Sequence, residues 1–252
     1  MRICTVQFDG HSGDKYSRLL NVFRNSCRIN SPGIYFDEIK LPDQSKDYNY
    51  TWNQQANTLK LKKWYEYMLE AKEMVVFADC DMLCTGDISK IEQYDFDIAY
   101  SGDSTINHKI NGGIIFARPT EAARNFFKEW VKQNEIILTD PIEFRKYTPW
   151  AGQNQRAFGR MMTLGYPDCK LLRLKPLVWN ATDSYWSKIN NETLLVHIKG
   201  QIRNLVLENK KPYGVYEKVM NEWYKYANIN VKELKELWKT ETRKQRVPNR
   251  WA

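Results

Sequence analysis

Residues 74–83, with the sequence MVVFADCDML, place the tightest constraint on how this chain can fold. A short apolar run from Met74 to Ala78 is followed by two carboxylates, Asp79 and Asp81, one residue apart. The run is too short for a stable helix and suits a strand that is buried on both faces. In open α/β sheets, ligands bind at the carboxyl ends of the strands. This stretch therefore predicts an α/β fold with an acidic site at the end of a central strand.

Asp79 and Asp81 are candidate metal ligands. Two neighbouring carboxylates at a strand end repel each other and lose hydration unless a cation or hydrogen-bond donors lie between them. Mg²⁺ and Mn²⁺ prefer oxygen ligands and often keep phosphates as further ligands. The alternative is a strand end with two acids in solvent, and an Asp-x-Asp pair alone does not decide between the two.

The order of the elements before this strand favours a largely parallel sheet. A strand is expected at residues 1–8, and Asp14 is expected to cap a helix after the polar turn that follows. A second strand at residues 34–41 leads through a polar loop to a helix with Trp64 on its apolar stripe. Together with residues 74–78, these elements give a β-α-β-α-β run, whose crossovers are right-handed in nearly all proteins.

The second half of the chain alternates predicted strands and helices and ends in two amphipathic helices. Thr120 is expected to cap a helix with Phe126 and Trp130 on its buried face. The two final helices contain Trp223 and Trp238. Four strands are expected, at residues 97–100, within 111–119, at 171–180 and at 193–198.

Composition limits the class of protein. A chain of 252 residues with 42% hydrophobic residues can bury one large core, and we expect one α/β domain with a small appendage. No apolar run approaches the roughly 18 residues that a membrane span needs. The amino terminus reads as a strand rather than a signal peptide. Five scattered cysteines without metal-site spacing favour reduced thiols and a cytoplasmic protein.

Positive charge is concentrated at the carboxyl end of the chain. Residues 210–252 hold 11 Lys and Arg against 5 Glu, so they carry six of the eight net positive charges. This distribution predicts either an anionic partner for this end or a solvated face on helices that pack against the domain. The sharper interpretation is reversible, salt-sensitive docking of a peripheral protein on anionic lipid.

Three motifs, in this order, resemble those of GT-A-fold glycosyltransferases, most closely the retaining group that includes glycogenin and bacterial lipopolysaccharide galactosyltransferases. The first motif is the apolar run that ends in Asp79 and Asp81. The second is Asn-Gly-Gly-Ile-Ile-Phe, which begins at Asn111, and the third is His197 followed three residues later by Gly200.

The resemblance implies a GT-A fold, which is a Rossmann-like, mixed and mainly parallel sheet flanked by helices. We expect a GT-A domain over residues 1–205 and basic helices packed on it over residues 206–252. The implied activity is transfer of a sugar from a nucleoside diphosphate donor, a UDP-sugar, to a hydroxyl group of a glycan or glycolipid acceptor. Retention at the anomeric carbon is a further implication of the resemblance.

In the family that the chain resembles, the Asp-x-Asp pair and a late histidine hold Mn²⁺ or Mg²⁺. The matching residues are Asp79, Asp81 and His197, and Asp79 is also expected to meet the nucleotide ribose. A set of two oxygen donors and one nitrogen donor suits Mn²⁺ and leaves positions for two phosphate oxygens. An ordinary strand-end histidine is the alternative interpretation of His197.

Further residues are expected around the nucleotide and its phosphates. Gly200 matches the glycine that lets the backbone approach the diphosphate. The Lys-Pro-Trp ending of the family motif is missing here, so Arg203, or Lys199, is expected to hold the phosphates; a guanidinium binds them bidentately. Phe8 and Asp9, at the end of the first strand, are expected to line the nucleotide site.

On the sugar side, the resemblance makes Asn111, Gln155 and Asp103 the catalytic candidates. Asn111 and Gly112 match the turn that faces the donor sugar, and Asp103 lies in the preceding loop, where the family has an acid at the sugar hydroxyls. Gln155 matches the amide beside the anomeric carbon, but its neighbours depart from the family's Asp-Gln-x-x-apolar-Asn pattern, so Gln153 is an alternative. A plain glycine turn, a solvated loop acid and surface glutamines on a helix are the competing interpretations.

Three rival functions stay open at this point. An inverting glycosyltransferase needs a carboxylate as general base, and Asp103, Asp140 and Glu143 are available. A haloacid-dehalogenase-type phosphatase also has an apolar-Asp-x-Asp motif, but it needs a later Gly-Asp-x-x-x-Asp sequence, which this chain lacks. A nucleic-acid-binding protein is suggested by the net charge of +8, but no nucleic-acid motif accompanies it.

Overall fold

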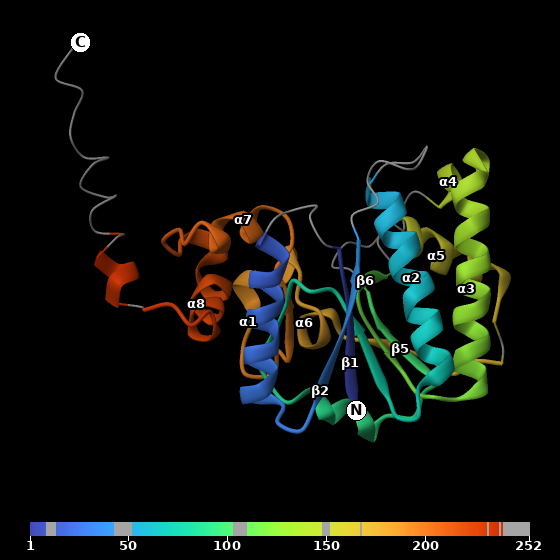
Figure 1. Ribbon diagram of the computed structural model, residues 1–252, viewed down its shortest axis with the longest axis horizontal. Helices are drawn as coiled ribbons and strands as arrows, with labels where there is room; N and C mark the ends of the chain where they lie inside the picture. The colour runs from blue at the N-terminus through green and yellow to red at the C-terminus, as the bar shows by residue number, and fades with distance from the viewer. Residues whose placement is uncertain are drawn as a thin grey trace, which may run out of the picture.

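The computed structural model describes residues 1–8, 14–42, 52–102, 110–147, 152–166, 168–230, 232–236 and 238. The strands form a six-stranded sheet in the order β2-β1-β3-β6-β5-β7 and a separate two-stranded sheet of β4 and β8. Figure 1 shows the larger sheet standing between helices on both sides. The α/β class predicted from the sequence is therefore confirmed.

The first half of the chain supplies the parallel part of the larger sheet. β1 pairs in parallel with both β2 and β3, as the predicted β-α-β-α-β run requires. All four residues of β3 are buried, which fits a short apolar strand covered on both faces. The elements are β1 (Arg2–Phe8), α1 (Lys15–Asn30), β2 (Tyr35–Leu41), α2 (Trp52–Glu70) and β3 (Val75–Ala78).

The second half of the chain makes the sheet mixed. β6 runs antiparallel to β3 and β5, whereas β5 runs parallel to β7, so three of the five strand pairs are parallel. The predicted mixed, mainly parallel sheet is thus confirmed. The further strands are β4 (Met82–Cys84), β5 (Ile98–Ser101), β6 (Asn111–Ala117), β7 (Leu171–Leu174) and β8 (Leu195–His197). The further helices are α3 (Glu121–Thr139), α4 (Pro141–Lys146), α5 (Gln153–Leu164), α6 (Pro176–Trp179), α7 (Gln201–Leu207) and α8 (Glu217–Tyr226), with short 3-10 turns η1 (Ile88–Gln93), η3 (Asp183–Lys188) and η4 (Gly214–Tyr216).

Two apolar cores lie on opposite faces of the larger sheet. Because successive side chains of a strand point to opposite faces, Val75 and Phe77 of β3 belong to one core, and Val76 and Ala78 belong to the other. The first core is completed by α2, α3 and α5, and the second mainly by α1 and α6. In Figure 1, α2 and α3 accordingly stand on the opposite side of the sheet from α1.

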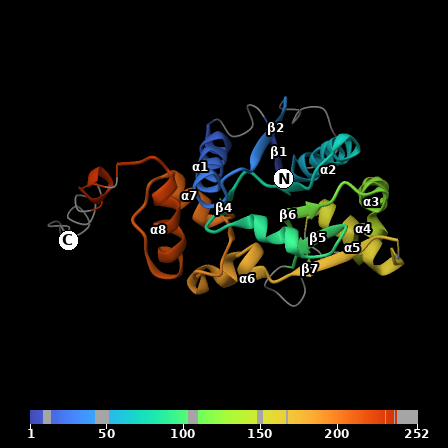
Figure 2. The same cartoon turned by 90° about the horizontal axis from the view of Figure 1, so that it is seen from below.

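A third core joins α1 to the carboxyl-terminal elements. It combines residues of α1, β4 and β8 with residues of α7 and α8, among them the buried Trp223. Figures 1 and 2 both show α7 and α8 beside α1. Residue 205, where a boundary is expected from the sequence, lies inside α7, and the division of the chain at that point stays a prediction.

Three local predictions are wrong. Asp14 precedes α1, but its side chain makes no capping hydrogen bond. The strand expected over residues 171–180 ends at Leu174, because Pro176 has no amide hydrogen for a ladder and instead opens the helix α6. Asn111 and the two glycines after it belong to β6 rather than to a turn.

Candidate functional site

Strand pairing brings Asp79, Asp81 and His197 together at one end of the sheet. Asp79 directly follows β3, and its N–H donates to the carbonyl of Gly113 on β6 at 2.9 Å. β4 begins directly after Asp81 and runs antiparallel to β8, so that Met82 lies opposite His197. Segments that are far apart in the sequence thereby set the histidine beside the acidic pair.

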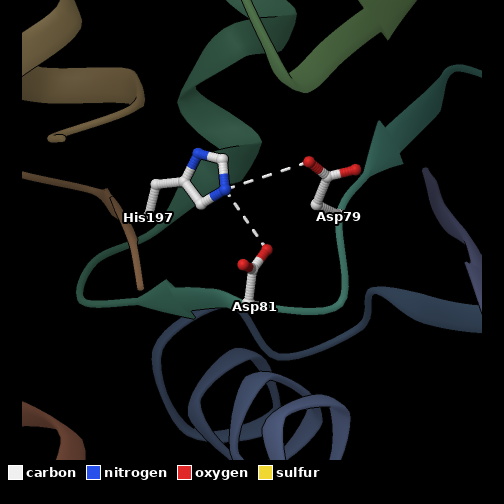
Figure 3. A group of neighbouring side chains, drawn as sticks. All are labelled: Asp79, Asp81 and His197. Atoms are coloured by element: carbon white, nitrogen blue, oxygen red, sulfur yellow. Dashed lines mark ion pairs between the residues drawn. The ribbon is translucent and has the colours of Figure 1, made fainter. Parts of the chain in front are cut away.

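The three side chains point toward a common position, as Figure 3 shows. His197 Nε2 lies 3.2 Å from Asp81 Oδ1 and 3.8 Å from Asp79 Oδ2. One donor atom from each residue lies within 4.8 Å of the other two. Asp81 is only 3% exposed and His197 only 6%, so the interpretation as two acids in solvent is wrong for Asp81.

Two cationic side chains bind the outer oxygens of the acidic pair. Lys60 of α2 places Nζ 2.6 Å from Asp79 Oδ1, and Arg203 of α7 places Nη2 2.6 Å from Asp81 Oδ2. The other oxygen of each carboxylate, Asp79 Oδ2 and Asp81 Oδ1, faces the imidazole of His197. The two ion pairs therefore fix each carboxylate with one oxygen directed at the common position.

This arrangement fits a divalent metal ion. Metal–oxygen bonds of about 2.1 Å in octahedral geometry put adjacent donor atoms roughly 3 Å apart, which is close to the 3.2 Å between His197 Nε2 and Asp81 Oδ1 and shorter than the 3.8 Å between His197 Nε2 and Asp79 Oδ2. Two carboxylate oxygens and one imidazole nitrogen form a mixed donor set of the kind that holds divalent metal ions. Since Lys60 and Arg203 occupy only the outer oxygens, neither cation takes the place of the ion.

The electrostatics of the site keep Asp81 ionised. Burial by itself would raise the pKa of Asp81, but His197 and Arg203 oppose it and hold that pKa at about 2. Burial would lower the pKa of Arg203, and the facing Asp81 raises it instead. Between the two acids, burial raises the pKa of the Cys80 thiol, which keeps it neutral. The site thus presents a fixed carboxylate and a fixed guanidinium at neutral pH.

A cavity of about 160 Å³ opens beside the acidic pair. Its lining includes Phe8 at the end of β1, Tyr16 of α1 and Asn57 of α2. Asp79, Asp81, Lys60 and Arg203 also line it. The carboxyl ends of the parallel neighbours β1 and β3 meet here, which is the edge where open α/β sheets bind ligands.

Asn111 and Gln155 both hold the start of β6. Asn111 Oδ1 accepts from the N–H of Gly113 at 2.9 Å and lies 3.2 Å from His197 Nδ1. Gln155 Oε1 accepts from the N–H of Gly112 at 3.1 Å, and its Nε2 donates to the carbonyl of Ile110 at the same distance. The predicted residues Asn111, Gly112 and Gln155 are therefore neighbours around one strand end.

Gln153, the alternative to Gln155, is not a surface residue. It is 4% exposed, and its Nε2 donates to the carbonyl of Asn134 on α3. Asp9 and Asp103 lie outside the residues that the structure describes. Their expected roles at the nucleotide and the sugar stay predictions.

The segment after His197 carries the residues expected at the diphosphate. Gly200 precedes α7 with a backbone φ of +62°, a conformation that favours glycine, and this explains its presence independently of any ligand. Lys199 Nζ lies 3.5 Å from Asp183 Oδ1, whereas Arg203 lies in the cavity wall. Of the two candidates for the phosphates, Arg203 is the one that faces the acidic pair.

A model of the nucleotide-diphospho-sugar transferase family matches residues 21–203. The chain belongs to this family. It is therefore a glycosyltransferase that uses a nucleotide-sugar donor, and the phosphatase and nucleic-acid interpretations are wrong. No curated protein sequence matches the chain.

Solved glycosyltransferase structures share the fold of this transferase. A glycosyltransferase involved in the glycosylation of the major capsid of PBCV-1 is 12% identical, with a TM-score of 0.57 over 82% of this chain and 98% of that one. The galactosyltransferase LgtC, solved with donor and acceptor sugar analogs, is 12% identical, with a TM-score of 0.59 over 94% and 99% of the two chains. GlyE of Streptococcus pneumoniae TIGR4 is 12% identical, with a TM-score of 0.54, and the match covers 96% of this chain and 64% of GlyE. These matches confirm the predicted GT-A fold.

Lys60 and Asn180 are among the residues near the site that sequence reasoning missed. Lys60 precedes Trp64 by one helical turn, and its Nζ lies 4.8 Å from the centre of the Trp64 ring. In the sequence, the feature that could have indicated a role for Lys60 is its place beside the apolar residues of α2, because a lysine there can pack its aliphatic chain against them and direct its charge elsewhere. Asn180 carries no motif of its own, and its contact with Asn111 depends on the fold.

Proposed function

We propose that this glycosyltransferase binds Mn²⁺ or Mg²⁺ through Asp79, Asp81 and His197 and takes a UDP-sugar as donor. The observation that carries the proposal is the convergence of two inner carboxylate oxygens and His197 Nε2, with the outer oxygens already held by Lys60 and Arg203. When bound, the ion neutralises charge that develops on the leaving nucleoside diphosphate.

Arg203 is the proposed diphosphate-binding residue, with Gly200 allowing close approach of the backbone. Its guanidinium is held from two sides, through Nη2 by Asp81 and through Nη1, which donates to the Tyr16 hydroxyl at 3.1 Å. A guanidinium fixed in this way is oriented before the ligand arrives, and it offers planar donors that match phosphate oxygens. Lys60 adds a second positive charge to the same cavity wall.

Phe8 and Asp9 are the proposed contacts of the nucleoside, and Asp79 is the proposed contact of its ribose. The cavity supports this proposal because it extends from Asp79 to the end of β1, where Phe8 stands. The assignment of uridine as the nucleoside rests on the resemblance to the retaining group of glycosyltransferases.

Transfer with retention is proposed, with Gln155, Asn111 and Asp103 on the sugar side. Two acids that could serve an inverting mechanism already have structural partners. Asp140 accepts from the N–H groups of two residues in the first turn of α4, and Glu143 binds the guanidinium of Arg160 at 2.7 Å. These contacts favour retention over inversion by either acid, and the anomeric configuration of the product, read by NMR, tests it.

The proposed acceptor is a glycan or glycolipid hydroxyl reached by a cytoplasmic enzyme that docks on membranes through its basic carboxyl end. None of the helices that the structure describes has the length and apolar composition of a membrane span. The excess of Lys and Arg over residues 210–252 supports salt-sensitive attraction to anionic lipid. We expect sedimentation with anionic but not neutral vesicles at low salt, and equal partitioning to both lipids would contradict the docking.

A donor screen tests the central part of the proposal. UDP-, GDP- and ADP-linked hexoses are offered to the full chain with Mn²⁺, with Mg²⁺ or with EDTA, and release of the nucleoside diphosphate is measured. We expect release from a UDP-hexose only with metal, and loss of that release in Asp81→Asn. The control is Asp95→Asn, which changes an exposed acid paired with Lys170 and should behave as wild type. Equal release in EDTA and in Mn²⁺ would contradict metal dependence.

A further inference from the structure

The connection between α7 and α8, which lie next to each other in Figure 1, carries two exposed apolar side chains. Tyr213 is 48% exposed and Val215 is 58% exposed. Gly214 between them has a backbone φ of +52°, and a Cβ atom there would meet nothing within 4 Å apart from its chain neighbours. Residues 213–215 therefore form a turn that projects from the surface, and we refer to them as the apolar tip.

Aromatic contacts attach the apolar tip to the core. The ring of Tyr213 packs edge-to-face against the ring of Tyr216, with centroids 5.6 Å apart. The ring of Tyr216 lies 5.7 Å from that of Trp186, which is only 4% exposed. Aromatic pairs at such separations attract each other. The tip is thus held in place before it meets a partner, so that little conformational freedom remains to be lost on binding.

The same contacts connect the apolar tip to the proposed donor site. The hydroxyl of Tyr216 donates to Gln201 Oε1 at 3.0 Å, and Gln201 begins α7, two residues before Arg203. Trp186 Nε1 donates to the carbonyl of His197 at 3.3 Å. The tip is therefore fixed relative to the segment that carries both the proposed metal ligand and the proposed diphosphate-binding residue.

Positive charge surrounds the apolar tip. Residues 199–218 hold five basic side chains against two acidic ones, which gives this segment a net charge of +3. Lys211 precedes the tip by two residues and is exposed. Anionic lipid headgroups attract basic residues at a membrane surface, and tyrosine is enriched where headgroups meet hydrocarbon. The basic residues are Lys199, Arg203, Lys210, Lys211 and Lys218, and the acidic residues are Glu208 and Glu217.

The size and chemistry of the apolar tip favour a membrane over other partners. A stable protein interface buries roughly 800 Å² on each partner, far more than two side chains supply. Recognition of a sugar needs polar groups placed around its hydroxyls, and Gly214 and Val215 have no polar side chain. A bilayer, by contrast, accepts a small apolar insertion whose neighbouring lysines stay among the headgroups.

We propose that Tyr213 and Val215 insert into the headgroup region of an anionic membrane. The proposal rests on the proposed function in taking this transferase to act at a membrane, and it adds a defined apolar contact to the attraction by the basic carboxyl end. Because Tyr216 links the tip to Gln201 beside the donor site, insertion brings that site close to the bilayer. Among the proposed acceptors, this orientation favours a glycolipid.

Cosedimentation of the full chain with vesicles tests the insertion. The vesicles contain equal parts of phosphatidylglycerol and phosphatidylcholine, or phosphatidylcholine alone, and each is used at low and at high salt. The tip variant, Tyr213→Ser with Val215→Ser, should bind the anionic vesicles about tenfold more weakly at either salt concentration, because it loses apolar area but no charge. Neutral vesicles should bind neither protein, since two apolar side chains alone give too little attraction.

Two further variants separate apolar insertion from charge. Ile29→Ser with Tyr35→Ser removes one aliphatic side chain and one tyrosine that are 59% and 64% exposed, and it should bind as wild type does. The charge variant replaces four basic residues of the carboxyl end with glutamine, and its binding should depend less steeply on salt than that of wild type or the tip variant. The four residues are Arg243, Lys244, Arg246 and Arg250.

A fluorescent label reports the insertion directly. All five native cysteines are buried, so a thiol introduced by Val215→Cys can be labelled selectively with a polarity-sensitive dye. We expect a blue shift of the emission when anionic vesicles are added, because the dye leaves water. The same dye on Ile29→Cys, which is at the end of α1, should show no shift.

The outcomes separate this proposal from the proposed function. Wild-type affinity in the tip variant, or an unshifted dye at residue 215 in vesicle-bound protein, would overturn the insertion; docking by the basic end then stands if the charge variant loses binding. Failure of wild type to bind anionic vesicles would overturn both membrane contacts and leave the metal and donor assignments unaffected. A wild-type dimer in sedimentation velocity that the tip variant abolishes would assign the tip to a second copy and also overturn the proposal. Melting curves show whether each variant is folded.

Discussion

At the scale of single residues, the acidic pair is held by cations on its outer side. Lys60 and Arg203 each bind one oxygen of a carboxylate and leave the other directed at His197. The charges of the two carboxylates are therefore compensated without blocking the position where three donor atoms meet. The same cations face the cavity, where they are available to an anionic ligand.

Lys60→Met should weaken UDP binding roughly tenfold, because it removes a positive charge from the cavity wall and releases the orientation of Asp79. The matched control is Lys62→Met on the same helix, where the lysine is 44% exposed and pairs with Glu135. Calorimetric titration with UDP in Mn²⁺ measures both variants. Equal affinity in Lys60→Met and wild type would show that Lys60 only supports the fold.

The grouping of Asp79, Asp81 and His197 agrees with the expectation from the resemblance to GT-A glycosyltransferases, in which an Asp-x-Asp pair and a late histidine share one site. The sequence did not predict Lys60 or Asn180. Their contacts depend on how α2 and α6 pack against the sheet, and nothing local to either residue encodes that packing. Side-chain direction in the fold, rather than residue type, makes them part of the site.

At the scale of elements, capping chemistry separates a correct prediction from a wrong one. Thr120 and Asp14 both precede helices and both have a side chain suited to capping. Thr120 accepts from the N–H of Ala123 at 3.2 Å and also donates to Asp97 Oδ1 at 2.7 Å. Asp14 has α-helical backbone angles and no capping hydrogen bond, so only Thr120 has the extended conformation of a cap.

Thr120→Ala should therefore lower the free energy of unfolding by about 1 kcal/mol, the usual effect of removing a capping side chain. Asp14→Ala serves as the control and should change it by less than about 0.5 kcal/mol, as for an ordinary surface substitution. Denaturant unfolding followed by circular dichroism measures both. A loss in Asp14→Ala as large as that in Thr120→Ala would contradict the assigned cap.

The helix α6 could not be predicted from the local sequence pattern. Residues 171–180 alternate like a strand, yet Pro176 ends the ladder and starts α6. This helix matters for the site, because its end places Asn180 beside β8. The order of the strands in the larger sheet could not be predicted from the sequence either, because the antiparallel insertion of β6 between β3 and β5 depends on long-range pairing.

At the scale of the whole molecule, the two apolar cores on the faces of the larger sheet bury every cysteine of the chain. All five thiols are free and buried. Burial raises the pKa of Cys4 to about 12 and that of Cys169 to about 12. The sequence predicted reduced cysteines, and their distribution across separate elements, with no metal-site spacing, was enough to do so.

Alkylation of Cys4 and Cys169 should be slow in the folded protein. A thiol reacts as its thiolate, and a pKa near 12 instead of 9 leaves about a thousandfold less thiolate at pH 8. Raising the pH to 10 should increase the thiolate fraction about tenfold per pH unit in the native protein, whereas the denatured thiols approach saturation above pH 9. Iodoacetamide labelling followed by mass spectrometry measures each site, and equal rates with and without denaturant would contradict burial.

The central claim is that a divalent ion joins Asp79, Asp81 and His197 to the diphosphate of the donor, and its most direct test is a calorimetric titration of UDP. Wild type is measured in Mn²⁺ and in EDTA, and Asp81→Asn is measured in Mn²⁺, with melting curves to confirm that the variant is folded. We predict saturable binding only for wild type in Mn²⁺, because Asp81 presents one oxygen to the ion and is held ionised by its neighbours. Binding of UDP to Asp81→Asn as tightly as to wild type, or equally to wild type in EDTA, would contradict the claim.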